Sequence, residues 1–130
     1  MNPHDAAHNL AGALRESTDF KELKDAQAAL KADPSTLAML IDFRKEQFEI
    51  QKQKLTGVEV STEQEEKLKK LFEVINMNTT IRQVLQAEYR VAVLLQDVHK
   101  IIGDATGEVI DPELMALPEE NEKENGNHQS

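Results

Sequence analysis

The sequence predicts an all-α protein, an elongated helical bundle in which two long antiparallel helices form a hairpin. Two short N-terminal helices are expected to pack on this hairpin, and a further short helix is expected near the C-terminus. The 130 residues are 30% charged and only 4% aromatic, a composition typical of long helices. Apolar residues recur at three- and four-residue spacing, and Pro34 and Gly57 stand where the pattern breaks.

The first two helices are expected to begin at capping residues. Asn2 is a capping residue followed by Pro3, which is well suited to the first helical position. Residues 15–20 interrupt the pattern, and Ser17 or Thr18 can cap a second helix there. The inward face of the second helix is expected to comprise Phe20, Leu23, Ala26 and Leu30.

The third helix is expected to run from Pro34 to about Thr56. Asp33 is its expected cap, and Gly57 can adopt the left-handed conformation that ends a helix. The later turns carry only a thin apolar stripe, which we expect to face the other long helix of the same chain. This stripe comprises Phe48, Ile50 and Leu55.

The fourth helix is expected to begin at Ser61 or Thr62, both of which fit a capping box, and to end at Gly103. No proline or glycine interrupts this long segment. Its weak point is residues 76–80, where Asn and Thr side chains compete for backbone hydrogen bonds. Either a bend or two helices meeting end to end is therefore expected there.

One helical domain is expected from residues 1–118, followed by a disordered acidic and polar tail at residues 119–130. Within the domain, Asp111 is expected to cap the last short helix. The first residues lack a signal-peptide pattern, and no run of 18 apolar residues could span a membrane. The absence of cysteine excludes disulfides and thiolate catalysis. We therefore expect a cytoplasmic protein with no membrane partner.

A metal site is the first candidate for chemistry. His4 and His8 stand one helical turn apart with Asp5 between them, as in a metal-dependent hydrolase. The pair lacks a third ligand and lies where chain ends fray, which favours two solvent-facing histidines. We therefore expect no metal, no cofactor and no catalytic residue.

An RNA-binding surface is the second candidate. Interleaved glutamates dilute the lysine clusters, and the net charge of −9 disfavours contact with phosphate backbones. Solvated helix faces are therefore the favoured interpretation, with no nucleic-acid partner. The lysines concerned are Lys52 and Lys54, and Lys67, Lys69 and Lys70.

A buried charge pair is expected between the two long helices. Glu88 interrupts an apolar row of the fourth helix, and Arg44 interrupts one of the third. Antiparallel packing would bring them together as a structural pair that fixes helix register, because a buried carboxylate needs a partner. The alternative is that both side chains extend into water.

The later part of the fourth helix has more apolar surface than one-sided packing requires. The two N-terminal helices are too short and too rich in alanine to cover it all. Each large apolar side chain left in water would forgo about 1.5–3 kcal/mol. We therefore expect a homodimer or a higher even-numbered assembly. The predicted interface comprises Leu85, Val91, Val93, Leu94, Val98 and Ile101.

Three segments resemble a known family, in order and in spacing, over about residues 4–103. They are "LAGALRESTDFKELKDA", "FRKEQFEIQKQKLTGVEVS" and "LQAEYRVAVLLQDVHKII". They resemble the YheA-like family of small bacterial proteins in the YlbF/YmcA superfamily. The resemblance implies a cytoplasmic, self-associating helical protein, and it supplies no catalytic residues. Some superfamily members carry iron–sulfur clusters on cysteines, which this chain lacks.

The expected function is that of a non-enzymatic oligomeric protein acting through protein–protein interaction, as a regulator or adapter. Distant YlbF/YmcA relatives, which are subunits of a complex linked to ribonuclease Y and developmental control, imply such a role by resemblance. The expected partners are a second copy of the chain and another protein. The RNA-binding and metal-dependent alternatives remain open at this point.

Overall fold

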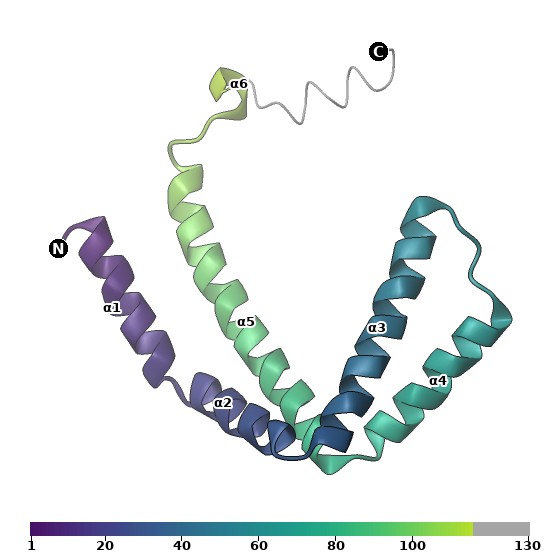
Figure 1. Cartoon of the computed structure of the whole chain (residues 1–130). Helices are drawn as coiled ribbons and strands as arrows, with labels where there is room; N and C mark the ends of the chain where they lie inside the picture. The colour runs from purple at the N-terminus through teal and green to yellow at the C-terminus, as the bar shows by residue number, and fades with distance from the viewer. Residues whose placement is uncertain (116–130) are drawn as a thin grey trace, which may run out of the picture. The chain divides into compact units, whose positions relative to one another are not determined.

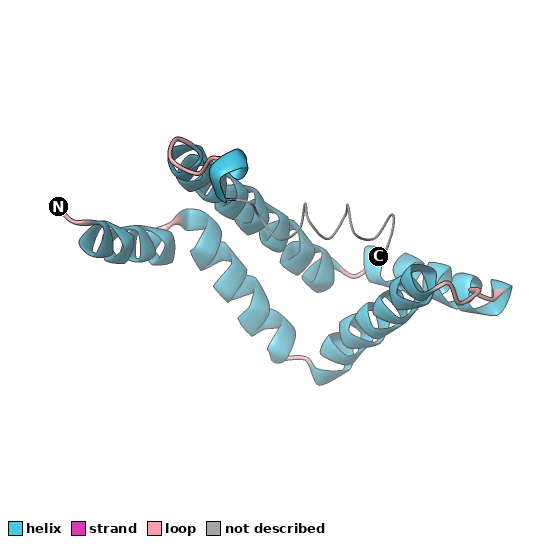
Figure 2. Ribbon diagram, turned by 90° about the horizontal axis from the view of Figure 1, so that it is seen from above, coloured by secondary structure: helices cyan, strands magenta, loops and turns pink. Residues whose placement is uncertain are grey.

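A computed structural model describes residues 1–115 as helices joined by short turns (Figure 1). No strand occurs within this range, and the predicted all-α fold class is confirmed (Figure 2). No helix among these residues is both long and apolar enough to cross a membrane. The helices are α1 (Pro3–Glu16), α2 (Thr18–Lys31), α3 (Pro34–Thr56), α4 (Thr62–Asn76), α5 (Thr79–Gly107) and α6 (Pro112–Met115).

The chain divides within α5 into two compact units, residues 1–92 and the residues from 93 onward. The single domain of residues 1–118 therefore stays a prediction, and the predicted tail at residues 119–130 lies outside the described range.

Capping side chains begin the first four helices, as predicted. The Asn2 side chain accepts a hydrogen bond from the backbone of the first turn of α1 at 2.8 Å, and Ser17 does so for α2 at 3.2 Å. Asp33 caps α3 in the same way. Ser61 and Gln64 form a complete capping box at the start of α4, with reciprocal bonds of 3.0 and 3.1 Å.

The end of α3 follows the prediction, because Gly57 adopts the left-handed conformation with φ of 79°. The weak point at residues 76–80 separates two helices rather than bending one. The helix α4 ends at Asn76, and the Asn78 side chain then accepts a 2.9 Å hydrogen bond from the backbone N–H of Ile81 in the first turn of α5.

The predicted end of the long helix at Gly103 is wrong, because α5 continues to Gly107. A glycine inside a helix costs only about 1 kcal/mol relative to alanine, which a long helix tolerates. The Thr106 hydroxyl also donates to the carbonyl groups of Ile102 and Gly103, at 3.2 and 3.0 Å. Gly103 therefore lies within the helix.

The core of the first unit lies where four helices converge. Leu30 comes from α2, Leu40 from α3, Ile75 from α4, and both Ile81 and Val84 from α5; none is more than 4% exposed. Five half-buried side chains pack around these residues: Ala26, Leu37, Met39, Phe43 and Leu85. This cluster accounts for the convergence of the helices, because burying such side chains is the main favourable term in folding.

The helices α3 and α4 lie side by side as an antiparallel hairpin (Figure 1). Successively later residues of α3 contact successively earlier residues of α4, as in any antiparallel pair. These contacts fix the register of the two helices. The side-chain pairs are Phe43 with Phe72 (ring centroids 6.1 Å apart), Glu46 with Lys67 (3.1 Å) and Gln53 with Gln64 (2.6 Å).

The prediction that the thin stripe of α3 faces its own chain is wrong for two of its three residues. Ile50 is 5% exposed, but Phe48 is 67% and Leu55 is 87% exposed. At about 100° per residue, Phe48 lies about 200° and Leu55 about 140° around the helix from Ile50. Ile50 lies on the buried side of α3. Phe48 and Leu55 therefore point away from that side.

The cap of α3 carries a pH dependence. The Thr36 hydroxyl and then the Ser35 hydroxyl donate to the Asp33 carboxylate, at 2.7 and 3.0 Å, and hold the pKa of Asp33 below its ordinary value of 3.8. Because folding favours the charged form, this contribution to stability is present above the ordinary pKa. It is lost as the pH falls through the lowered value.

We expect Asp33→Asn to be less stable than the unsubstituted protein near neutral pH, with the difference shrinking once the pH falls below about 4. Urea unfolding of both proteins across this range measures the effect. All other carboxylates are common to the two proteins, so the difference isolates Asp33. A difference that stays constant with pH would refute the prediction.

Candidate functional site

The first part of α5 is held by the core of the first unit. Ile81, Val84 and Ala87 are each at most 1% exposed, and their three-residue spacing places them on one side of the helix. On another side, Tyr89 is 71% exposed. One side of the first part of α5 is therefore buried in the core of the first unit, and another side is open to solvent.

An ion pair joins α3 to α5 at this point. The Arg44 guanidinium donates to a Glu88 carboxylate oxygen at 2.6 Å. The side chains are 47% and 34% exposed, so the predicted burial of this pair is corrected. Both residues lie at the edge of an open hollow whose floor includes Leu40 and Val84, which leaves the charges in contact with water. That the pair fixes helix register stays a prediction.

A second charged contact joins α5 to α2, and the sequence analysis missed it. Arg90 lies 3.2 Å from Glu22 and 4.0 Å from Asp19. The two acidic residues are three positions apart on α2 and so lie on one side of that helix. This spacing was the only signal in the sequence, and it does not say which arginine would reach them.

The predicted interface residues all lie on α5. In the first unit, Leu85 is half-buried and packs against the core, and Val91 is half-buried as well. In the second unit, Leu94 and Val98 are half-buried, whereas Val93 is 37% and Ile101 is 69% exposed. Leu85 is thus partly used within the chain, and the role of the set as an interface stays a prediction.

Further apolar side chains of the second unit are open to solvent. Ile102 on α5 is 49% exposed, and Val109 and Leu114 are each 83% exposed. Together with Ile101 they place several large aliphatic groups in water near the end of α5 and beyond it. Large exposed apolar surface is typical of sites that bind other proteins.

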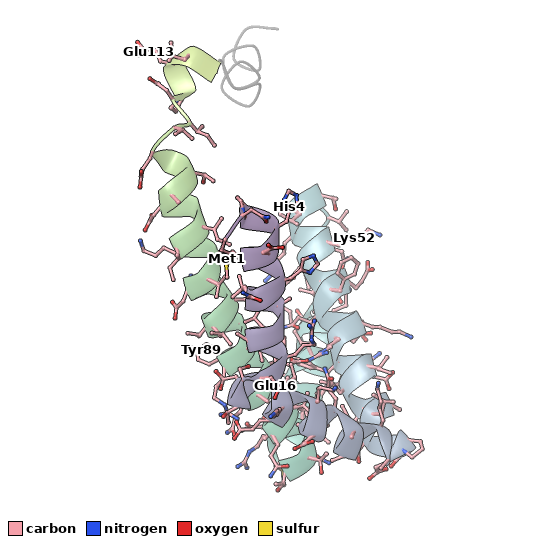
Figure 3. The ribbon with its side chains drawn as sticks, turned by 90° about the vertical axis from the view of Figure 1, so that its left-hand side faces the viewer. Met1, His4, Glu16, Lys52, Tyr89 and Glu113 are labelled. Carbon is pink, nitrogen blue, oxygen red and sulfur yellow. The ribbon has the colours of Figure 1, made fainter. Side chains whose placement is uncertain are left out.

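The candidate metal-binding residues lie at the start of α1 (Figure 3). His4, Asp5 and His8 are all exposed. Among residues 1–115, no group of three His, Cys, Asp or Glu side chains is placed to hold a metal ion. The structure thus brings no third ligand to this pair within the described range.

We expect the double substitution of His4 and His8 by alanine to change the unfolding free energy by less than about 1 kcal/mol, as at ordinary surface positions. Thermal unfolding of both proteins checks this expectation. Elemental analysis of the purified protein provides the control. A stoichiometric metal that disappears in the double variant would instead make the histidines a genuine site.

The candidate RNA-binding lysines do not form an unbroken basic surface. Lys67 pairs with Glu46 of α3, and Lys69 and Lys70 share a shallow hollow with Glu66 and Glu73. Lys52 extends from α3 into solvent (Figure 3). Because acidic groups accompany the lysines of α4, this surface offers phosphates repulsion as well as attraction.

Comparison with known proteins identifies the family. The profile described as "Control of competence regulator ComK, YlbF/YmcA" matches residues 4–105. A UPF0342 protein of Symbiobacterium thermophilum is 43% identical over 102 residues, which are 78% of this chain and 91% of the relative. A UPF0342 protein of Lactobacillus delbrueckii is 41% identical over 108 residues, 83% and 92% of the two chains. These matches confirm the resemblance seen in the sequence.

Solved structures share the fold. A protein of unknown function (DUF964) from Bacillus stearothermophilus has a TM-score of 0.69 and 21% identity, over 82% of this chain and 93% of that one. YheA from Bacillus subtilis gives 0.61 and 26%, over 85% and 100%. Bacillus subtilis RicA, crystallised in complex with RicF, gives 0.60 and 18%, over 83% and 96%.

Proposed function

This chain belongs to the YlbF/YmcA family, and we propose that it is a non-enzymatic regulator or adapter that acts by binding other proteins. The observation that carries the proposal is the open apolar surface near the end of α5, where Ile101 and Ile102 are 69% and 49% exposed. Removing apolar surface from water contributes about 25 cal/mol per Å² to binding a partner, and the lost freedom of the two molecules opposes this gain. A helix with this surface is suited to docking against another protein.

Family membership supports the regulatory part of the proposal. The family is described by control of the competence regulator ComK, which is a regulatory role. RicA, which shares the fold, is found in a complex with RicF. A role beside ribonuclease Y and developmental control, as in the YlbF/YmcA complex, is the specific form that we propose for this chain. We propose the cytoplasm as its location.

Self-association is the second part of the proposal. The same α5 surface would form a two-fold contact with a second copy, giving a homodimer or a higher even-numbered assembly. Of the predicted residues, Val91, Leu94, Val98 and Ile101 share one side of α5 and would make this contact, whereas Leu85 and Val93 lie on other sides of the helix. A contact of this kind is isologous, so one substitution changes it twice, once on each copy.

Affinity capture from the native organism tests the proposed function. Tagged wild-type protein and a tagged Leu94→Glu variant would be used as parallel baits, with captured proteins quantified by mass spectrometry. We expect the wild type to retain untagged copies of itself and a defined protein partner, and the variant to retain fewer untagged copies. Capture of only the proteins that a tag alone retains would contradict the proposal.

A further inference from the structure

One side of α4 carries a regular row of charged and apolar residues. The row lines an open hollow of about 340 Å³ on the surface of the first unit. Its members recur every three or four positions and therefore share one side of the helix. They are Glu63, Glu66, Lys67, Lys70, Leu71 and Val74; we call this row the α4 stripe.

The charges of the α4 stripe are arranged antisymmetrically. Glu63 and Glu66 precede Lys67 and Lys70, and the midpoint of the four lies between positions 66 and 67. Reversing the direction of the helix about this midpoint places position 63 on position 70 and position 66 on position 67. Every acidic residue then meets a lysine. A second α4 in antiparallel orientation is therefore complementary in charge.

The charges are largely free to make such contacts. Of the four, Lys67 forms an ion pair with Glu46 at 3.1 Å, and it remains 62% exposed. Within the described part of the chain, Glu63, Glu66 and Lys70 form no ion pair. The same spacing could support α4 through contacts between Glu and Lys four residues apart. Those contacts are not formed here.

Apolar side chains extend the match beyond the charges. In the antiparallel arrangement, Val74 at the end of one α4 lies toward the start of the other α4 and the non-helical turn that precedes it, residues 57–61. Val74 is 49% exposed, and Val58 in that turn is 53% exposed. Both would lose solvent contact on pairing, which favours association.

We propose that the α4 stripe binds the α4 stripe of a second copy of this chain, antiparallel about a two-fold axis between positions 66 and 67. This contact is separate from the one proposed on α5. Because charge pairing contributes most of its specificity, added salt weakens it, whereas an apolar contact on α5 is much less sensitive. An assembly that used both contacts would have an even number of copies.

Charge exchange tests the proposal, in a Leu94→Glu background that removes the α5 contact. Glu63→Lys and Lys70→Glu should each weaken association about tenfold, because the two-fold axis repeats each new repulsion. Mixing the two variants should restore association, since the new lysine of one variant then lies opposite the new glutamate of the other. Analytical ultracentrifugation at low salt measures all three samples. Unchanged association of either variant, or a mixture without recovery, would overturn the proposal.

The matched control is Glu65→Lys, which makes the same charge change on the opposite side of α4. Position 65 lies about 200° from position 63 around the helix. We expect association of this control to be unchanged, and loss of association there would overturn the assignment to the stripe.

A cysteine cross-link gives a second, independent readout. The chain has no cysteine, so Glu66→Cys can form a disulfide only between two copies. We expect rapid formation of a covalent dimer by Glu66→Cys and little by Glu65→Cys under the same oxidant. Equal rates would overturn the proposal. Because these readouts report on α4, their failure leaves the proposed role of α5 to be judged by the capture experiment.

Discussion

Ile81→Ala is expected to lower the free energy of unfolding by about 2–5 kcal/mol, the range for removing a large aliphatic side chain from a core. Ile81 is fully buried, and it packs with Leu30, Leu40, Ile75 and Val84. Because these residues come from four helices, the cavity would loosen the convergence of the whole first unit. A loss of this size is a large part of the stability of a small domain.

Urea denaturation at one fixed protein concentration measures this effect, since the stability of an assembling protein depends on concentration. Ile81→Val, which removes a single methylene group, should cost about 0.5–1.5 kcal/mol and remains measurable if the alanine variant does not fold. The control is Ile110→Ala, where the side chain is 44% exposed, and its effect should be about 0.5 kcal/mol or less. Equal losses at positions 81 and 110 would show that the core is elsewhere.

Leu94→Glu is expected to weaken self-association by at least about thirtyfold. Leu94 is half-buried on α5, at the centre of the proposed contact. An unpaired carboxylate in an interface costs about 2 kcal/mol or more, and the two-fold axis would set two of them close together. Sedimentation over a concentration series measures the change. The control, Gln96→Glu, adds a carboxylate about 200° away around the helix and should leave association unaltered.

The local structure of the chain was the part most readily predicted. The helix starts at Asn2, Ser17, Asp33 and Ser61 depend on hydrogen bonds between residues three positions apart, so the sequence contains the whole interaction. The same holds for Gly57, where a left-handed conformation favours glycine. Features set by neighbouring residues follow from spacing alone.

Features set by packing between helices were harder to predict. Phe48 and Leu55 were expected to face the same chain because they are apolar, yet the register of α3 against α4 leaves them exposed. That register depends on pairs such as Glu46 with Lys67, which are distant in sequence and include a polar contact. Apolar periodicity does not identify which of two apolar rows a helix buries.

The charged contacts also include a part that the sequence predicts and a part that depends on packing between helices. The pairing of Arg44 with Glu88 was predicted because each interrupts an apolar row, and the two lie 2.6 Å apart. Its exposure corresponds to the alternative left open by the sequence, because the depth of a residue depends on the packing of three helices. Arg90 interrupts no such row, and its contact with Glu22 therefore had no comparable signal in the sequence.

Above all, we propose that the protein self-associates. Multi-angle light scattering of the unsubstituted protein at micromolar concentration is the most direct test of this self-association. The chain has a mass of 14.6 kDa. We expect a mass that is an even multiple of this value, and we expect Leu94→Glu to lower it. A folded protein that keeps the mass of a single chain throughout the concentration range would contradict the proposed self-association.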